Sequence, residues 1–244
     1  MSEQWSPNTW APVTLKARIE HAPGLATFVL EGHRCAFTPG QFVQLGLEID
    51  GEPVGRPYSL SSAPGADLET LIVRVDDGQL TPRLFELSPG DPLYVHRVAS
   101  GAFGLRRVQD APTLWMIATG TGLSPFLSML RAGGLERFGK VVLVHGVRQG
   151  AHLVAREEIA ALGAQHVAVV SREAVPGALS GRITEQIASG ELERVAGAPL
   201  DPSAQVLLCG NPAMIAETYG LLTDRGLTRN RPRKPGNITF EAYW

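Results

Sequence analysis

The chain has 244 residues, enough for two ordinary domains or one large one, and either could bury a substantial core. Its 22 Lys and Arg residues nearly balance 24 Asp and Glu residues, so overall charge favours neither a nucleic-acid partner nor a membrane partner. The N-terminus lacks the basic-then-apolar pattern of a signal peptide, and no apolar run is long enough to span a bilayer. We therefore expect a cytoplasmic protein.

The cysteine and histidine content argues against a metal centre. Cys35 and Cys209 stand far apart in the sequence, and the six histidines show no metal-ligand spacing. An iron–sulfur cluster normally needs four thiolates, and a structural zinc site needs Cys and His residues close together in sequence. A redox protein built on this chain would therefore need an organic cofactor.

The first half, from about Val13 to Val98, is predicted to form short strands separated by turns that contain Gly and Pro. The expected strands are VTLKARIEHA, LATFVLEG, FVQLGLEID, PYSLSSAP, TLIVRVDDG and PLYVHRVA. This spacing predicts an antiparallel barrel or sandwich. One helix is expected within it, TPRLFEL, where Thr81 can serve as N-cap and Pro82 suits the first helical position.

After Asp110 the pattern changes to apolar strands that alternate with helical segments. The expected strands are TLWMIATG, KVVLVHG, HVAVVSR and AQVLLCG, each apolar throughout, as in a parallel sheet covered on both faces. The second half is therefore predicted to be a doubly wound α/β domain. The charged segment GLRRVQDAP marks the boundary, so we expect domains at residues 1–106 and 107–244.

The first strand of the second half leads into Gly120-Thr121-Gly122-Leu123-Ser124-Pro125 and then a helix. Small residues let a backbone approach a diphosphate closely, and a helix N-terminus offers free N–H groups. Such a turn alone is weak evidence, because many are ordinary strand-to-helix connections. Its place at the first junction of the sheet favours a dinucleotide site.

Arginines follow the next strands of this half: Arg148 after VVLVHGV, Arg172 after HVAVV, and Arg182 in ALSGRI. Domains that prefer NAD commonly carry an acidic residue about twenty positions after the glycine-rich turn. Here that neighbourhood is KVVLVHGVR, which has no carboxylate. Each arginine alone is most simply a solvated surface residue. Together they fit a 2′-phosphate, which favours NADP over NAD.

The last strand of the second half ends in Cys209-Gly210-Asn211-Pro212, ahead of a helix. An isolated cysteine is most simply a small buried core residue. At a strand end beside the glycine-rich turn, however, Cys209 could line a nicotinamide pocket. No local base would make it a covalent nucleophile.

The stretch RPYSLSS carries unusual chemistry for a strand. Arg56 can neutralise a phosphate, Tyr58 can stack on a flat isoalloxazine ring, and Ser59 can hydrogen-bond near the reactive flavin nitrogen. Farther along, residues 78–81 lead into a short helix whose N-terminus suits a diphosphate. A polar edge strand and a capped helix would explain either piece alone.

Taken together, these motifs resemble the bacterial branch of the ferredoxin/flavodoxin–NADP reductase family. RPYSLSS resembles its flavin motif, GTGLSP and CGNPAM resemble its two nicotinamide-side motifs, and SRE with SGR resembles its 2′-phosphate site. The C-terminal PGNITFEAYW is similar to the aromatic end of one bacterial subgroup. The likeness covers essentially the whole chain.

The resemblance implies an FAD-binding antiparallel β-barrel followed by an NADP-binding α/β domain with a doubly wound parallel sheet. Its C-terminal aromatic tail would return to the flavin, which lies in the cleft between the domains. Tyr58 would cover one flavin face, Tyr243 the other, and Trp244 would lie against the adenine. Ser59, Cys209 and Glu241 would surround the site of hydride transfer, with Tyr243 as a further catalytic residue.

The resemblance also implies the cofactor contacts. Those expected for FAD are Arg56, Pro57, Tyr58, Ser59, Val73, Arg74, Val75, Gly78, Gln79, Leu80, Thr81, Tyr243 and Trp244. Those expected for NADP(H) are Thr119, Gly120, Thr121, Gly122, Pro125, Arg148, Ser171, Arg172, Arg182, Gly210, Asn211 and Met214. Main chain around Arg74 and Val75 would hold the ribityl region of the flavin.

The activity implied is electron transfer between NADPH and ferredoxin or flavodoxin through FAD, in a monomer. These carriers are usually acidic in this family context, so the basic segment Arg225 to Lys234, together with Arg106 and Arg107, would attract them. One alternative is a reductase component of an oxygenase or cytochrome system. The other is an FAD electron-transfer subunit that never meets a nicotinamide, but it leaves GTGLSP and the arginines without a purpose.

Overall fold

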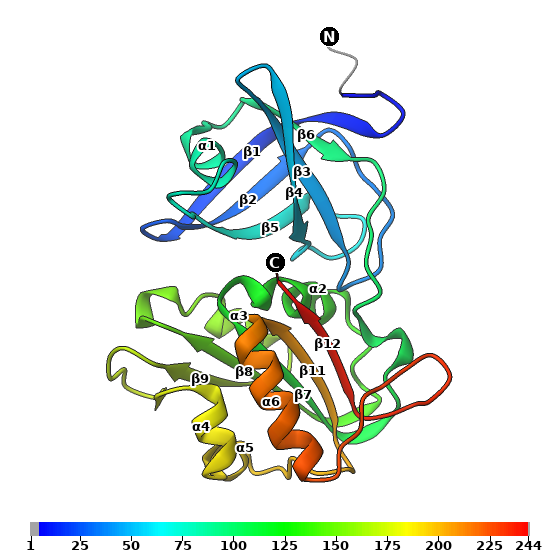
Figure 1. The fold of residues 1–244 in the computed structure, drawn as a ribbon, viewed down its shortest axis with the longest axis vertical. Coiled ribbons are helices and arrows are strands. Elements are labelled where there is room, and N and C mark those ends of the chain that lie inside the picture. The colour runs from blue at the N-terminus through cyan, green and yellow to red at the C-terminus, as the bar shows by residue number, and fades with distance from the viewer. Residues whose placement is uncertain (1–4, 244) are drawn as a thin grey trace.

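The computed structural model of the protein describes residues 5–243, which form two halves with a six-stranded sheet each (Figure 1). The role expected of Trp244 therefore lies outside the described residues. The chain passes from the first sheet to the second between His96 and Ala111. This connection contains a short 3-10 helix, η1 (Leu105–Arg107).

The first sheet is antiparallel and curls into a barrel around its own core (Figure 1). Its strands are β1 (Trp10–Ala22), β2 (Leu25–Glu31), β3 (Phe42–Ile49), β4 (Glu52–Ser59), β5 (Leu68–Val73) and β6 (Pro92–His96), in the order β4-β3-β6-β1-β2-β5. Alternate side chains such as Leu15, Phe28 and Leu45 are buried inside, as the period of a strand requires. The predicted antiparallel barrel is confirmed.

Two local predictions for this half need correction. The strand expected at PYSLSSAP ends at Ser59, so Leu60 to Ser62 lie beyond β4. The helix α1 (Thr81–Glu86) forms where expected, but its N-cap is Leu80 rather than Thr81. The Thr81 hydroxyl instead accepts a hydrogen bond from the Val75 N–H at 2.9 Å, which closes the preceding turn.

The second sheet is parallel throughout, in the order β10-β9-β8-β7-β11-β12. Its strands are β7 (Ala111–Thr119), β8 (Phe138–Val147), β9 (Gln165–Val170), β10 (Leu179–Ser180), β11 (Gln205–Gly210) and β12 (Ile238–Ala242). The central strands are buried on both faces, so the predicted doubly wound α/β domain is confirmed.

Helices cover both faces of this sheet (Figure 1). They are α2 (Ser124–Ala132), α3 (Arg156–Ala161), α4 (Ile183–Ala188), α5 (Glu191–Ala196) and α6 (Pro212–Asp224), with the 3-10 helices η2 (Gly120–Leu123) and η3 (Gly150–His152). The first two helices pack in one apolar cluster and the last three in another. Order in the sheet brings β7 beside β11, so the turns that follow these strands meet.

The two halves share an apolar interface. Ala22, Leu25 and Leu71 of the first half are buried in the same cluster as Leu123 and Leu127 of the second. Strand β12 runs toward this boundary and ends there (Figure 1), and Tyr243 after it lines the same cavity as residues of the barrel. The fold thus places the ends of β4, β7, β11 and β12 near one another.

No helix among residues 5–243 has the length and apolar character needed to cross a bilayer. Within the same range, no cluster of three or more His, Cys, Asp or Glu side chains could hold a metal ion.

Candidate active site

A cavity of about 540 Å³ lies where the two halves meet. Side chains from both halves line it. Of the residues predicted to bind cofactors or to act in hydride transfer, it brings together Arg56, Pro57, Tyr58, Ser59, Val73, Val75, Gly78, Gln79, Leu80, Thr81, Thr121, Glu241 and Tyr243. It is also lined by Ser124, from the glycine-rich turn but not among the predicted contacts, and by Phe42, Leu71, Ile72 and Ala242, which sequence analysis did not single out.

Phe42 could have been found from strand pairing. It stands opposite Ser59 in the antiparallel register of β3 and β4, and it also pairs with Ser100. Residues directly opposite in such a pair have neighbouring side chains. Once the register of the β3–β4 hairpin is known, any residue opposite the RPYSLSS motif is therefore a candidate to line the cavity.

The end of β4 presents its chemistry to this cavity. Ser59 is buried, and burial raises the pKa of Tyr58 to about 12, with Arg56 opposing the shift. The exposed Arg56 guanidinium donates to the side-chain oxygen of Gln79 at 3.1 Å. It therefore lies against the turn at residues 78–81, where the sequence predicts a diphosphate.

The turn after β5 exposes apolar side chains to the cavity. Val73, the last residue of β5, and Val75 are 43% and 49% exposed, and both line the cavity. The backbone N–H groups of Arg74 and Val75 already donate, to Gly24 and to Thr81 respectively. The Arg74 side chain pairs with Asp76 at 3.0 Å. The two valines can form an apolar wall beside a flat ring. The N–H groups of Arg74 and Val75 already donate hydrogen bonds within the protein, so they are not free donors for a ligand.

Cys209 and Glu241 are neighbours across the parallel pair β11 and β12. Burial raises the pKa of the fully buried Cys209 thiol, and the nearby Glu241 carboxylate raises it further, so the thiol stays protonated. Burial also raises the pKa of Glu241 to about 7. Glu241 can therefore hold or release a proton near neutral pH, while Cys209 cannot act as a thiolate.

Tyr243 closes the cavity from the C-terminal side. Its backbone N–H donates to the Gly210 carbonyl at 2.9 Å, which continues the pairing of β12 with β11. Its hydroxyl is buried and makes no hydrogen bond within the described residues, although Ser59 and Cys209 lie near enough to affect its pKa. Burial raises that pKa well above the ordinary value. An unpartnered buried hydroxyl in a cavity is a group that a ligand can satisfy.

The glycine-rich turn η2 packs against the end of β11. A Cβ on Gly122 would clash with the Cys209 carbonyl oxygen, and a Cβ on Gly210 would clash with the Thr119 side chain. The Thr119 hydroxyl accepts from the Asn211 N–H at 2.9 Å. Glycines at these two positions therefore let the two nicotinamide-side motifs touch.

Asn211 and Met214 have structural partners in this arrangement. The Asn211 side-chain oxygen accepts from the N–H groups of Ala213 and Met214 and thereby caps α6. The Met214 sulfur accepts from the Thr218 hydroxyl at 3.5 Å. Pro125, also predicted as a contact, is buried in the first turn of α2. None of these three residues lines the cavity.

His145, treated in the sequence only as a packed strand-end residue, also supports this turn. It is buried on β8, and one ring nitrogen, Nε2, lies 3.0 Å from the Gly120 carbonyl oxygen. Burial lowers its pKa to about 4, so the ring is neutral at physiological pH and Nε2–H can donate to that carbonyl. Gly120 has a φ of +53°, and this hydrogen bond holds that conformation.

The three predicted arginines lie at the ends of three adjacent strands. Arg148 follows β8 and Arg172 follows β9, and the Arg172 N–H donates to the Arg148 carbonyl at 3.0 Å. Arg182 follows β10, which pairs with β9. All three side chains are exposed, and no carboxylate within residues 5–243 forms an ion pair with them.

Two carboxylates do stand near these arginines. Glu185 accepts from the Arg182 backbone N–H at 2.7 Å, and Glu173 accepts from the Gly150 N–H at 2.5 Å. Ser171 directs its hydroxyl to the Val147 carbonyl at 3.3 Å. Both carboxylates are engaged by backbone groups, so the guanidinium groups remain available for an anion.

These features fit the cofactors expected from the sequence. The valine wall, the Tyr58 ring and the unpartnered Tyr243 hydroxyl suit a flat aromatic ring with polar edges. Arg56 beside the turn at residues 78–81 suits a diphosphate, and the three strand-end arginines suit a phosphate monoester.

Comparison with known proteins agrees with this division of the chain. Residues 11–103 match the oxidoreductase FAD-binding domain family, and residues 116–219 match the oxidoreductase NAD-binding domain family. A flavodoxin/ferredoxin–NADP reductase of Shigella flexneri is 46% identical over 218 residues, which are 85% of this chain and 88% of that protein.

Solved structures show the same likeness. A ferredoxin NADP+ reductase from Neisseria gonorrhoeae, with bound FAD and NADP, is 32% identical, with a TM-score of 0.91 over 96% of this chain and 98% of that one. A cytochrome P450 reductase, GcoB, from Amycolatopsis is 27% identical, with a TM-score of 0.77. Here 96% of this chain corresponds to 70% of that one.

Proposed function

The chain belongs to the flavodoxin/ferredoxin–NADP reductase family, and from that membership we propose the roles of its individual residues and the nature of its carrier. It is an FAD-containing oxidoreductase that transfers electrons between NADPH and ferredoxin or flavodoxin. We assign residues 1–106 to the FAD domain and 107–244 to the NADP domain. A cytoplasmic location and a monomeric state stay predictions from the sequence.

The observation that supports these roles best is the cavity shared by the two halves. The residues of the RPYSLSS motif at the end of β4 line the same cavity as residues of η2, of α2 and of the end of β12. Bound FAD would accept a hydride from NADPH and release single electrons to the carrier. Tyr58 and Tyr243 would cover the flavin ring, and Arg56 would neutralise the diphosphate.

The remaining residues then shape the place of hydride transfer. The buried Ser59 hydroxyl would offer a hydrogen bond at the ring edge, and the neutral Cys209 thiol, buried beside the cavity residue Glu241, adds no charge. Glu241, whose pKa is raised to about 7 by burial, can hold the proton that accompanies two-electron chemistry. The cleft excludes water and fixes orientation, which is how a cofactor enzyme gains most of its rate.

Anaerobic mixing of the purified holoenzyme with NADPH tests this assignment. Rapid loss of the flavin absorbance near its visible maximum is expected, followed by its return when an oxidised ferredoxin or flavodoxin is added. A protein that binds FAD but is not bleached by NADPH would contradict the assignment and favour an electron-transfer subunit.

We propose further that an acidic carrier docks on a basic patch next to the domain boundary. The patch consists of the exposed residues Arg106, Arg107, Arg229, Arg231, Arg233 and Lys234. The Asn230 side chain donates to the Arg107 carbonyl at 2.8 Å, so the two basic segments adjoin. Arg225, included in the segment by sequence, pairs instead with Glu193 at 2.6 Å and belongs to the fold.

Charge reversal tests the patch. Arg231→Glu with Arg233→Glu should slow carrier reduction at low ionic strength, with the difference from wild type shrinking as salt rises. Ferricyanide reduction should stay unchanged, because this small acceptor needs no docking surface. Equal slowing of both assays would contradict a docking role.

A further inference from the structure

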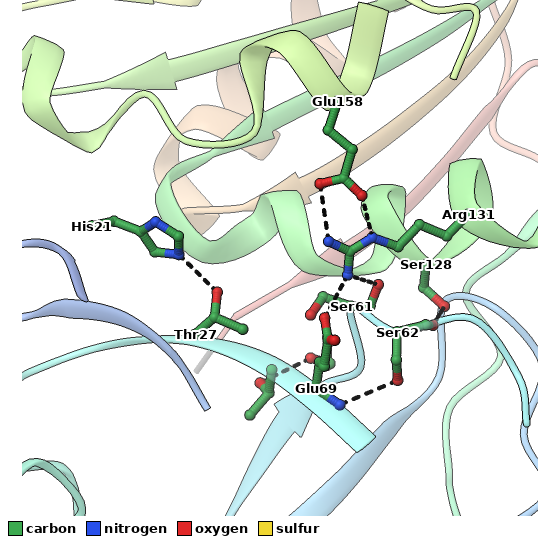
Figure 2. Close-up of polar contacts among 10 residues, drawn as sticks. His21, Thr27, Ser61, Ser62, Glu69, Ser128, Arg131 and Glu158 are labelled. Atoms are coloured by element: carbon green, nitrogen blue, oxygen red, sulfur yellow. Dashed lines mark hydrogen bonds and ion pairs between the residues drawn. The ribbon is translucent and has the colours of Figure 1, made fainter. Parts of the chain in front are cut away.

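Arg131, near the end of α2, joins the two halves of the molecule. Its guanidinium donates to Glu69 at 2.7 Å and to the Ser61 carbonyl at 2.9 Å, both in the first half. It also donates twice to Glu158 on α3, at 2.6 and 3.0 Å. Figure 2 shows this guanidinium between the two carboxylates, with the Ser61 carbonyl beside it.

A second hydrogen bond from α2 also connects the two halves. The buried Ser128 hydroxyl donates to the Ser62 carbonyl at 2.7 Å (Figure 2). The Ser62 hydroxyl in turn accepts from the Glu69 N–H at 3.2 Å. Helix α2 thus binds the backbone carbonyls of the two residues that end the RPYSLSS stretch, and neither residue lines the cavity.

The contacts of Arg131 and Ser128 with Ser61 and Ser62 lie between two parts of the proposed reaction site. On one side, Ser61 is two residues beyond Ser59, whose carbonyl accepts from the Thr70 hydroxyl at 3.0 Å. On the other side, α2 follows directly on η2, so Ser128 is four residues beyond the cavity residue Ser124. A shift of α2 relative to residues 59–62 would therefore move Thr121 and Ser124 relative to Ser59.

The apolar interface alone does not set this alignment. Ala22, Leu25 and Leu71 pack against Leu123 and Leu127, and such contacts hold surfaces together without fixing their direction. Hydrogen bonds depend strongly on distance and angle. A planar guanidinium that donates to two carboxylates therefore restricts how the elements that carry them can be oriented. Burial lowers the pKa of Arg131, but the negative charges of Glu69 and Glu158 raise it by more, so the guanidinium stays charged.

From this arrangement we infer that Arg131 and Ser128 are positioning residues that align the two halves for hydride transfer, a role that rests on the proposed function. Neither residue lines the cavity, and each acts through Ser61 and Ser62 on the end of β4. Their loss leaves both cofactor sites in place but misaligned with each other. A displacement of about 1 Å between reacting groups can slow a reaction about a hundredfold.

The test compares Arg131→Met with Arg225→Met as a matched control. Arg225 is buried to a similar degree, at 28% exposure against 24%, and likewise bonds a carboxylate and a backbone carbonyl. All its contacts, however, lie within the second half. Arg131→Met loses bonds to two carboxylates and a carbonyl, and Arg225→Met loses bonds to one carboxylate and a carbonyl, but only the first variant loses a link between the halves.

The main readout is flavin reduction by saturating NADPH in stopped flow. Arg131→Met should slow it about ten- to a hundredfold, with the dissociation constant for NADP⁺ unchanged, because the arginines at the strand ends are untouched. Arg225→Met should keep the wild-type rate. Ser128→Ala should slow it less, since one neutral hydrogen bond is removed.

A second readout does not depend on turnover. The change in the flavin absorption spectrum on adding NADP⁺ reports how the nicotinamide meets the flavin, and it should weaken in Arg131→Met but not in Arg225→Met. Backbone amides at residues 60–62 should also exchange hydrogen faster in the first variant alone.

Wild-type rates and spectra in Arg131→Met at normal FAD content would overturn the inference. So would equal slowing by both arginine variants, because it would assign the loss to general stability. If wild-type enzyme itself is not bleached by NADPH, the proposed function fails. In that case, faster hydrogen exchange at residues 60–62 in Arg131→Met alone would still show that Arg131 links the two halves. Unchanged exchange would contradict that link as well.

Discussion

The cleft between the halves and the arginine end of the second sheet differ in almost every physical property. Buried groups line or adjoin the cleft, such as Ser59, the Cys209 thiol and the Tyr243 hydroxyl, and burial raises the pKa values of Cys209, Glu241 and Tyr243. Arg148, Arg172 and Arg182, in contrast, are exposed and lie just beyond the ends of adjacent strands. We therefore expect the cleft to select its ligand by shape and desolvation, and the sheet end to select by charge.

This difference predicts how each region responds to change. A buried site depends on close packing, so small changes in shape should affect folding itself. An exposed cationic site should tolerate substitution with little loss of stability and respond mainly in ligand preference.

Gly210→Ala should have the largest effect. Gly210 has a φ of +129°, and a Cβ there would meet the Thr119 side chain and backbone, so we expect a loss of about 3 kcal/mol or more in the free energy of unfolding. Urea unfolding measures this. Gly134→Ala is the control, since its φ is +81° but nothing lies within 4 Å, and it should cost about 1 kcal/mol. Equal losses would show that the contact with Thr119 is unimportant.

Glu241 should give the cleft a pH-dependent stability. Its folded pKa, about 7, lies above the ordinary value of 4.5, so the folded ligand-free protein binds the proton more tightly. Stability is therefore fully present below pH 4.5 and falls as the pH rises toward 7, by at most about 3 kcal/mol.

Urea unfolding between pH 4.5 and 7.5 checks this expectation, with Glu241→Gln as the comparison. The variant cannot titrate at this position, so its stability should fall less than that of the wild type over the same range. Parallel curves for the two proteins would contradict the raised pKa.

The arginine end should show its effect in coenzyme choice. Arg172→Ala or Arg182→Ala should weaken NADPH by about ten- to a hundredfold, the worth of a charge-assisted hydrogen bond, and leave NADH nearly unchanged. The double variant should fall short of additivity because both side chains would serve one phosphate.

The measurement is kcat/KM for each coenzyme with ferricyanide as acceptor. Arg194→Ala serves as control, because Arg194 is exposed and pairs with Glu191 on α5. If the double variant keeps its preference for NADPH, these arginines do not bind the 2′-phosphate and are ordinary solvated surface residues.

Tyr243→Phe should have the smallest effect. The buried hydroxyl makes no hydrogen bond of ordinary geometry within the described residues, and the Ser59 hydroxyl and the Cys209 thiol lie close to it, so its removal should change the free energy of unfolding by about 1 kcal/mol or less. Thermal unfolding of the ligand-free protein measures this. A destabilisation above about 2 kcal/mol would reveal a partner for the hydroxyl.

Sequence patterns carried much of this information because they depend on local rules. The period of two along the first half and the apolar runs of the second predicted a barrel and a parallel sheet, and both are confirmed. The motifs at Arg56 to Ser59 and at Thr121 were predicted to share a site, and one cavity contains them. Each depends on a strand end, which spacing alone can place.

Other features depend on which segments the fold brings together, and no spacing in the chain records that. Phe42 enters the cavity through its register with Ser59. Ser61 and Ser62, at the end of the RPYSLSS stretch, accept hydrogen bonds from α2 through their backbone carbonyls, and Ser128 and Ser62 are 66 residues apart in the chain. The pKa of Glu241 likewise follows from burial at a domain boundary. Strand periodicity is local and readable, whereas burial and partnership between distant residues are properties of the tertiary structure.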